Sequence, residues 1–528
     1  MAVLNPAVAS APRPAGPARR TLAEVAAHLR LHGADIPDLF DLSPGLTTEA
    51  LVSGVTLDSR SVRPGDLYAA LPGATVHGAE FASVAAGAGA VACLTDAAGE
   101  GSAREAGLPT YVVDDPRRLL GPLAAWVYGE PSEGLLTIGV TGTNGKTTTA
   151  YLLASGLRRA GRSTGLIGTI ETRIGDAVLP SVRTTPEAPD LQALLAVMRE
   201  GGVDAVVMEV SSHALALRRV DGTTYDVAVF TNLSEDHLDF HADLEDYYAA
   251  KATLFTPQHS RSAVVNVDDA SGVRLAREAT VPVVSVSPSG GPADWRVVDA
   301  VLGPEGSTFT LLGPGGERVR TGTVMAGDFN VVNAALAVVA LAQSGIDVEL
   351  AAAGVQACEG VAGRMERVSP ADRGSPSGGP LALVDFAHSP DALERLLATC
   401  RGLVGPGGRL LVVIGAGGDR DPYKRPAMGA IAARDADVVV LTSDNPRTED
   451  PMTILAAMVD GAESIAGASV EVVPERRAAI ERAVRLAGSG DVVVVAGKGH
   501  EQGQEIDGMT HPFDDRVVLR EALGMARK

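Results

Sequence analysis

The stretch TIGVTGTNGKTTTA, residues 137–150, limits what this chain can fold into more than any other part of it. A short apolar run leads into a turn with two glycines, and a helix is expected from about Lys146. Backbone N–H groups in such a turn, together with the dipole of the following helix, favour a bound phosphate. Lys146 adds a cation, and Thr147 adds a hydroxyl suited to Mg²⁺. The stretch predicts a strand, a phosphate-binding loop and a helix.

One position departs from the common form of this loop. The pattern G-x-x-x-x-G-K-[ST] requires glycine where the chain has Val140. That position lies at the entry of the loop, away from the end that would face a phosphate. The alternative interpretation is an ordinary turn rich in glycine and threonine.

Composition excludes several classes of protein. With 528 residues, 45% of them apolar, the chain is long enough for roughly two to four domains. Its formal net charge of −20 argues against sequence-independent binding to nucleic acid or to an anionic membrane. No apolar run is long enough to cross a bilayer. Cys93, Cys358 and Cys400 lie far apart without C-x-x-C spacing, so we expect neither a zinc site nor disulfides. We therefore expect the protein to be located in the cytoplasm.

Short β-branched runs alternate with helical patterns along the chain, which predicts an α/β protein with parallel sheets. Residues 1–22, rich in Ala and Pro, are expected to form a disordered tail. Three domains are expected after it: a smaller N-terminal α/β domain over 23–131, a central domain over 132–363 and a C-terminal domain over 364–528. In the last of these domains, the strand-like runs end in glycine or polar residues, where open α/β sheets place ligand-binding loops.

Polar side chains follow the strand-like runs of the central domain. Glu209 lies near the end of the run AVVMEV, and a buried carboxylate there is costly unless it meets a cation. A metal beside nucleotide phosphates would supply one, although a hydrogen-bonded structural acid is the alternative. His237 lies in a loop rich in His and Asp, and Lys251 follows on an expected helix. For these two, spacing alone leaves metal ligation and ordinary exposed polar residues both open.

A series of motifs resembles the Mur ligases, which are ATP-dependent amide-forming enzymes of peptidoglycan precursor synthesis. The motifs are GTNGKTTT, MEVSSHAL, NLSEDHLDFH, DYYAAK, GDFNVVNAALA, GRMER, DFAHSPDAL, GGDRDPYKRPAMG, DNPRTEDP and GKGHE. The resemblance runs from about Thr56 to the C-terminus and is strongest to members that add the third peptide residue. This family uses a shorter loop, G-x-x-G-K-T, so Val140 does not count against the site. The resemblance implies a P-loop-type ATPase domain in the centre and a Rossmann-like C-terminal domain.

The resemblance also implies an ATP site and a metal site. Lys146, Glu209, His237 and Lys251 match catalytic positions of the family, and Lys251 matches a lysine that is carbamylated there. Two Mg²⁺ sites are implied, with ligands among Thr147, Glu209, His237 and carbamylated Lys251. The positions implied for ATP are Gly142, Thr143, Asn144, Gly145, Lys146, Thr147, Thr148, Asn330 and Arg364.

The other matching positions would bind the two remaining substrates. Leu57 and Ser59 match contacts to a uridine nucleotide, whereas Leu217 stands where some relatives carry glutamine. The positions matching contacts to the muramoyl-dipeptide are Thr184, Thr185, Ser211 and Arg219. The positions matching contacts to the incoming amino acid are Arg420, Asp444, Asn445, Pro446, Arg447, Gly497 and Glu501.

Arg447 bears on which amino acid is added. The version DNPR resembles ligases for diaminopimelate, whose second amino-acid head carries a carboxylate that a planar guanidinium can bind with two hydrogen bonds. The ammonium at the end of lysine would be repelled. The alternative is that Arg447 only caps a turn after Pro446.

The implied reaction is the addition of diaminopimelate to the glutamate γ-carboxylate of UDP-N-acetylmuramoyl-L-alanyl-D-glutamate through an acyl phosphate. A monomer is expected, with no nucleic-acid or membrane partner. A lysine-adding relative and an amide ligase similar to folylpolyglutamate synthase are the alternatives within the superfamily. A nucleotide-dependent switch or scaffold is the alternative from another class.

Overall fold

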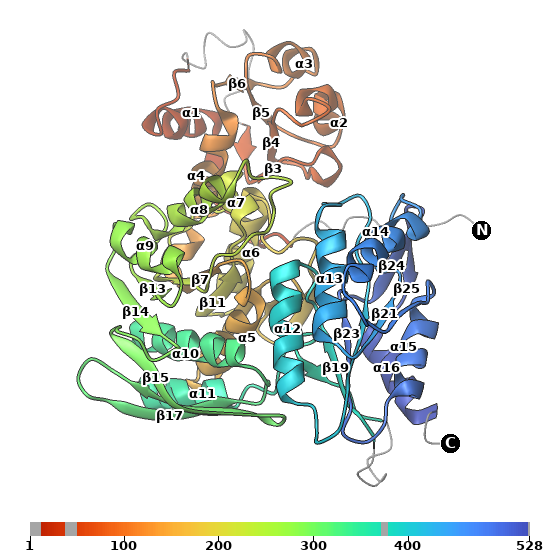
Figure 1. Ribbon diagram of the computed structural model, residues 1–528. Coiled ribbons are helices and arrows are strands. Elements are labelled where there is room, and N and C mark those ends of the chain that lie inside the picture. The colour runs from red at the N-terminus through yellow and green to blue at the C-terminus, as the bar shows by residue number, and fades with distance from the viewer. Residues whose placement is uncertain (1–11, 37–49, 371–378, 526–528) are drawn as a thin grey trace.

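The computed structural model describes residues 12–36, 50–370 and 379–525. Three larger sheets of four, eleven and six strands follow one another along the chain, each with helices on both faces (Figure 1). This arrangement confirms the predicted α/β class and multi-domain architecture. The domain boundaries at 131 and 363 remain predictions. Within the described part of the chain, no helix combines the length and the apolar character needed to cross a membrane.

The first sheet is parallel, and its strands bury both faces. Along β4, Leu67 and Ala69 pack toward one set of helices while Tyr68 and Ala70 pack toward the other, as the two-residue repeat of a strand requires. The strands are β3 (Gly54–Thr56), β4 (Asp66–Ala70), β5 (Ala92–Thr95) and β6 (Thr110–Val112). The helices are α1 (Leu22–Leu31) and α4 (Pro116–Val127) on one face, and α2 (Ala82–Gly87) and α3 (Glu100–Glu105) on the other.

The second part of the predicted tail is ordered. Arg20–Thr21 form strand β1, which pairs with β2 (Leu51–Val52), and helix α1 begins at Leu22. Upstream of it, the Arg13 guanidinium contacts the Asp66 carboxylate and the Tyr128 hydroxyl. The prediction of disorder was therefore wrong for residues 12–22, because Arg13 pairs with a buried carboxylate. For residues 1–11 it lies outside the described residues.

The eleven-stranded sheet is parallel only in its middle. Its order is β10-β9-β8-β11-β7-β12-β13-β14-β15-β16-β17, and β9, β10, β16 and β17 join by antiparallel pairing, so the expected parallel sheet is mixed at its edges. The central strands are β7 (Leu136–Thr141), β8 (Thr164–Ile167), β11 (Ala205–Glu209), β12 (Val227–Phe230), β13 (Ala263–Asn266) and β14 (Val283–Ser287). The remaining strands are β9 (Glu171–Ile174), β10 (Ala177–Pro180), β15 (Trp295–Gly303), β16 (Gly306–Leu312) and β17 (Arg318–Thr323).

Helices cover the parallel part of this sheet on both faces. On one face lie α5 (Lys146–Arg159), α10 (Asp328–Gln343) and α11 (Val348–Gln356). On the other lie α6 (Ala188–Glu200), α7 (Ser212–Ala216), α8 (Leu244–Ala252) and α9 (Ala270–Glu278). Because β7 lies between β11 and β12, the loops that follow these three strands meet at one edge of the sheet.

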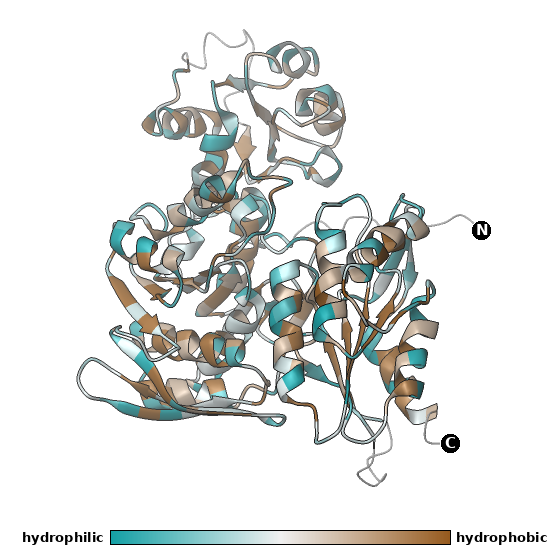
Figure 2. Cartoon of the chain, viewed as in Figure 1, coloured by the Kyte–Doolittle hydropathy of each residue, from teal (hydrophilic) through white to brown (hydrophobic). Residues whose placement is uncertain are grey.

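The third sheet has the order β18-β19-β23-β20-β21-β22 and is parallel except for its first strand. Figure 2 shows apolar colour along its central strands, which are buried on both faces. Its strands are β18 (Glu366–Arg367), β19 (Leu381–Asp385), β20 (Leu410–Ile414), β21 (Val438–Leu441), β22 (Val470–Val472) and β23 (Val492–Ala496). Helices α12 (Pro390–Gly402), α13 (Lys424–Asp435) and α14 (Pro451–Glu463) cover one face, and α15 (Arg476–Leu486) and α16 (Asp515–Met525) cover the other. A hairpin of β24 (Gly503–Ile506) and β25 (Met509–Pro512) follows β23.

Candidate active site

The predicted phosphate loop has the expected place in the fold. Strand β7 ends at Thr141, and helix α5 begins at Lys146. Gly142 and Gly145 adopt φ angles of 148° and 87°, which side-chain-bearing residues rarely adopt. A Cβ on Gly145 would lie 2.4 Å from the Asn333 Oδ1 atom, so the loop has no room for a larger residue there.

Two lysine amines meet at one carbonyl oxygen of this loop. Lys146 Nζ and Lys251 Nζ each lie 2.9 Å from the Gly142 oxygen, and Lys146 also donates to the Thr143 oxygen at 2.8 Å. Lys251 is buried, and its Nζ lies 4.4 Å from the centroid of the Tyr247 ring. The pKa of Lys251 lies well below that of an ordinary lysine. Burial is the larger cause, and the charge of Lys146 is the second.

Glu209 faces the same loop from the neighbouring strand. Its carboxylate accepts hydrogen bonds from the Thr147 hydroxyl at 2.8 Å and from the backbone N–H of Thr169 at 2.8 Å. Arg364 Nη2 donates to the Thr147 hydroxyl at 3.2 Å, and its guanidinium lies over the Phe386 ring. A threonine hydroxyl and a buried carboxylate thus lie together at the start of α5, where the oxygen donors fit a hard cation such as Mg²⁺.

The described residues contain no group of three or more His, Cys, Asp or Glu side chains placed to hold a metal by themselves. Mg²⁺ is ordinarily held by one or two carboxylates plus phosphate oxygens and water, so this finding agrees with a metal that enters with a nucleotide. His237 adopts a φ of 57° in the loop after β12. Burial lowers its pKa to about 4 against the pull of Asp236, so the ring is neutral near pH 7.

A cleft of about 1100 Å³ opens between the central and third sheets and brings most of the predicted residues together. From the central domain it is lined by Thr143, Asn144, Gly145, Lys146, Thr147, Thr148, Thr184, Glu209, Ser211, His237, Lys251 and Asn330. From residue 364 onward it is lined by Arg364, Arg420, Asp444, Asn445, Arg447, Gly497 and Glu501.

Some predicted residues do not line this cleft. Leu57 and Ser59 lie just after β3 in the first domain. Thr185 hydrogen-bonds the backbone of the Glu209–Ser211 segment, and Arg219 forms an ion pair with Glu187 at 2.8 Å. Gly142 and Pro446 are the remaining predicted residues that do not line the cleft.

One side chain of the third domain contacts two loops of the central domain. The Asp391 Oδ2 atom, in the first turn of α12, accepts hydrogen bonds from Asn144 Nδ2 at 3.1 Å and from the Ser234 hydroxyl at 2.8 Å. The phosphate loop is therefore tied directly to the domain that carries DNPR.

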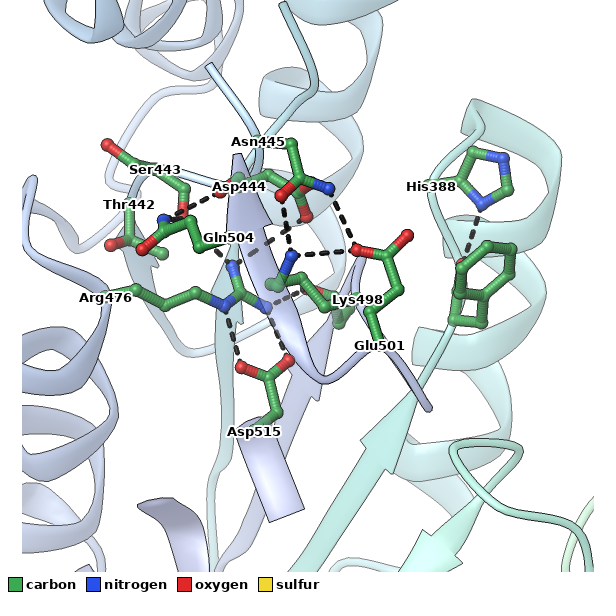
Figure 3. A network of polar contacts seen from close by, with 12 residues as sticks. His388, Thr442, Ser443, Asp444, Asn445, Arg476, Lys498, Glu501, Gln504 and Asp515 are labelled. Carbon is green, nitrogen blue, oxygen red and sulfur yellow. Dashed lines mark hydrogen bonds and ion pairs between the residues drawn. The ribbon is translucent and has the colours of Figure 1, made fainter. Parts of the chain in front are cut away.

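Arg447 is anchored on the third-domain side of the cleft. It adopts a φ of 54°, and its guanidinium donates to the Gly418 oxygen at 2.6 Å and pairs with Glu505 at 3.3 Å. Next to it, Asn445 Nδ2 donates to Glu501 Oε2 at 2.9 Å (Figure 3). Gly497 has a φ of 111°, and a Cβ there would lie 2.6 Å from Asp444 Oδ2.

Sequence reasoning missed several residues of this site. Lys498 is buried between two predicted residues of the motif GKGHE, and that place in the motif was a usable signal. Arg476 and Asp515 form a buried ion pair at 2.7 Å behind DNPR, but they lie outside every motif. Asp391 lies within DFAHSPDAL, although no spacing rule links it to the phosphate loop.

Comparison with known proteins shows similarity along almost the whole chain. Residues 51–128 match the model of the Mur ligase family catalytic domain, 140–341 the Mur ligase middle domain and 363–499 the Mur ligase glutamate ligase domain. A protein of Streptomyces coelicolor named UDP-N-acetylmuramoyl-L-alanyl-D-glutamate--2,6-diaminopimelate ligase is 57% identical over 97% of this chain and 98% of its own. A protein of the same name from Corynebacterium glutamicum is 48% identical over 90% of this chain and 92% of its own.

A solved structure agrees in fold. It bears the name UDP-N-acetylmuramoyl-L-alanyl-D-glutamate--2,6-diaminopimelate ligase and superposes with a TM-score of 0.64 at 33% identity. The match covers 93% of this chain and 100% of that one, so the similarity includes all three large sheets.

Proposed function

Since the chain belongs to the Mur ligase family, we propose that it joins diaminopimelate to the glutamate γ-carboxylate of UDP-N-acetylmuramoyl-L-alanyl-D-glutamate, with ATP converted to ADP and phosphate. The relatives named above support this substrate set. The observation that carries the proposal is a single cleft with the phosphate loop on one side and DNPR on the other. An amide ligase needs that arrangement because its acyl donor must be activated where its amine is bound.

The first step would join two anions. The γ-carboxylate attacks the γ-phosphorus of ATP, ADP leaves, and an acyl phosphate forms. Lys146, Arg364 and the loop N–H groups between 142 and 147 would bind the phosphates and offset their charge. Mg²⁺ held by Thr147, Glu209, His237 and carbamylated Lys251 would supply further neutralisation of the phosphate oxygens. The side chain of Asn330, buried beside the loop at the start of α10, would contribute to the nucleotide site.

Carbamylation of Lys251 is part of the proposal. A carbamate forms when a neutral amine attacks carbon dioxide and loses a proton, and it converts a cation into a carboxylate-like oxygen ligand. The buried Nζ of Lys251 lies 2.9 Å from a loop oxygen that also accepts from Lys146. A carbamate at Lys251 would carry negative charge and would pair with the Lys146 ammonium. The unmodified side chain instead places a second amine next to Lys146.

The second step needs a free amine near the activated carbon. Arg447 and Arg420 would bind a carboxylate of diaminopimelate, and Asp444 and Glu501 would receive an ammonium group. The other amine, unprotonated, attacks the acyl carbon, phosphate leaves with the bonding electrons, and the nitrogen passes one proton to the released phosphate. Pro446 and Gly497 would shape the loops that carry these side chains.

The nucleotide-sugar would reach from the first domain into the cleft. Leu57 and Ser59 would contact the uridine part, and Thr184, Thr185, Ser211 and Arg219 the dipeptide. Since Thr184 and Ser211 line the cleft and Leu57 does not, we infer that the first domain moves toward the cleft when substrates bind. We further propose that the ligase acts as a monomer in the cytoplasm. Light scattering of the purified protein measures its molar mass and so tests the monomeric state.

The deciding experiment measures phosphate release and product mass. The purified chain is incubated with ATP and UDP-N-acetylmuramoyl-L-alanyl-D-glutamate, together with diaminopimelate, lysine or no amine. We expect phosphate release and a tripeptide product only with diaminopimelate. A tripeptide product that contains lysine would select the lysine-adding alternative. ATP hydrolysis in the absence of both diaminopimelate and lysine would favour a nucleotide-dependent switch.

A further inference from the structure

Lys498 is a fully buried amine beside the cleft that the proposed reaction does not use. It follows β23, and its side chain is 0% exposed. Its Nζ lies 2.8 Å from Asn445 Oδ1 and 2.8 Å from Glu501 Oε2 (Figure 3). A buried ammonium is costly unless its charge and hydrogens are satisfied, so these two contacts account for its place.

The first contact fixes the orientation of the Asn445 amide. Its Oδ1 accepts from Lys498 Nζ and from the backbone N–H of Glu505 at 3.0 Å, and its Nδ2 donates to Glu501. A rotated amide would direct its own N–H groups against both donors. Lys498 thereby makes one of the two amide orientations the stable one.

The second contact fixes one oxygen of Glu501. Oε2 accepts from both Lys498 Nζ and Asn445 Nδ2, whereas no hydrogen bond among the described residues engages Oε1. The side chain is 34% exposed and lines the cleft. Glu501 is therefore held by one oxygen, with the other available to a ligand.

A second carboxylate oxygen faces the same place. Asp444 is a lining residue of the cleft, and its buried Oδ2 atom has no hydrogen-bond partner among the residues that the structure describes. The nearby Arg476 guanidinium lies 4.0 Å from it, but Arg476 is engaged by Asp515 through contacts of 2.8 and 2.7 Å. The cluster around Lys498 thus holds three carboxylates against two cations, and the excess negative charge lies toward the cleft.

We propose that Lys498 is a positioning residue for the incoming amino acid: it locks Asn445 and one oxygen of Glu501 so that the other oxygen, with Asp444, receives an ammonium group. This inference rests on the proposed function, because it assumes that the amine enters on the third-domain side. Lys498 itself is too buried to contact the substrate. Its effect should therefore appear in binding of the amino acid and not in binding of ATP.

The test is Lys498→Met, which keeps an unbranched apolar chain and removes the charge and the donors. We expect the KM for diaminopimelate to rise about 10- to 100-fold, as for a lost hydrogen bond to a charged group, and the KM for ATP to stay within about twofold. Lys498→Arg, which keeps the cation, should recover part of the loss. Arg520→Met, which removes an exposed cation from the same domain, is the matched control and should change neither constant.

The outcomes separate this inference from the proposed function. If the wild-type enzyme makes no product with diaminopimelate, the proposed function fails, and the KM for the amine that it does accept is measured instead. An equal rise in both KM values, or a fall in kcat with both KM values unchanged, would overturn the positioning role. If Lys498→Met does not fold, Lys498→Gln replaces it, and failure of both to fold would assign Lys498 to stability alone.

Discussion

Lys251 has surroundings that differ strongly from those of an ordinary lysine. It is buried beside a second amine, and burial holds its pKa well below the usual range. Lys251→Ala should lower kcat about a hundredfold or more, since it removes a proposed ligand of the Mg²⁺ that would neutralise phosphate charge in the transition state. Short carboxylic acids added to this variant should restore part of the rate. Failure of every acid tested would argue against a carbamate.

A spectroscopic readout of the same residue does not depend on activity. Wild-type protein equilibrated with ¹³C-labelled carbon dioxide should show a carbamate ¹³C signal that Lys251→Ala lacks. Lys424 is the matched control, because burial lowers the pKa of this cleft-lining amine as well. Lys424→Met should retain the signal. A signal that is lost in Lys424→Met but kept in Lys251→Ala would place the carbamate on Lys424 and contradict the proposal.

Arg447 is expected to set the choice of amino acid. Arg447→Ala should raise the KM for diaminopimelate about 10- to 100-fold, because a charge-assisted hydrogen bond to the carboxylate is lost. The KM for ATP should stay nearly constant, since Arg447 lies on the loop after β21 and the phosphate loop lies between β7 and α5. Steady-state kinetics with each substrate varied in turn measures both. Equal losses in the two constants would mean that Arg447 supports the loop and does not select the substrate.

At the scale of single elements, the phosphate loop should tolerate no side chain at Gly145. Its φ of 87° would strain any residue with a Cβ, and the contact of 2.4 Å would force the Asn333 side chain to shift. Gly145→Ala should therefore weaken ATP binding about tenfold or more. Gly161, at a φ of 81° with open space around its Cβ position, is the control. Gly161→Ala should lower the free energy of unfolding by about 1 kcal/mol, because it adds only backbone strain. Its ATP affinity, measured by calorimetry, should equal that of the wild type.

The elements that the sequence predicts best are those with a strong local pattern. The apolar runs before the phosphate loop and before DNPR became β7 and β21, because a strand buried on both faces needs an unbroken apolar run. The edge strand β10 has no such signal, since it is mostly exposed. Arg476 and Asp515, which are 39 residues apart, meet only through the packing of α15 on α16. No local pattern encodes that contact.

At the scale of the whole molecule, side chains and short loops join domains that fold around separate cores. Asp391 ties α12 to the phosphate loop, and Asn144 donates to it at 3.1 Å. Near the start of the described chain, the backbone N–H groups of Ala15 and Gly16 donate to Glu200 at the end of α6, at 2.8 and 3.1 Å. The segment before α1 thus bridges the first and central domains.

Arg13 makes this bridge matter for stability. Its guanidinium lies 3.3 Å from Asp66, whose side chain is 4% exposed. Arg13→Met would therefore remove the cation that offsets the burial of this carboxylate most strongly. The free energy of unfolding should fall by about 3 kcal/mol near pH 7. Arg19→Met, at an exposed arginine of the same segment, should have little effect. Chemical denaturation of the two variants compares them directly.

The loss should depend on pH in a definite direction. Burial raises the pKa of Asp66 even though Arg13 opposes the shift. Without Arg13, the folded-state pKa should rise further above the unfolded value, so the folded state binds a proton more tightly and gains stability as pH falls through that pKa. The difference between Arg13→Met and the wild type should therefore shrink on acidification. A difference that does not change with pH would mean that Arg13 acts through Tyr128 or the chain bridge, and not through the Asp66 charge.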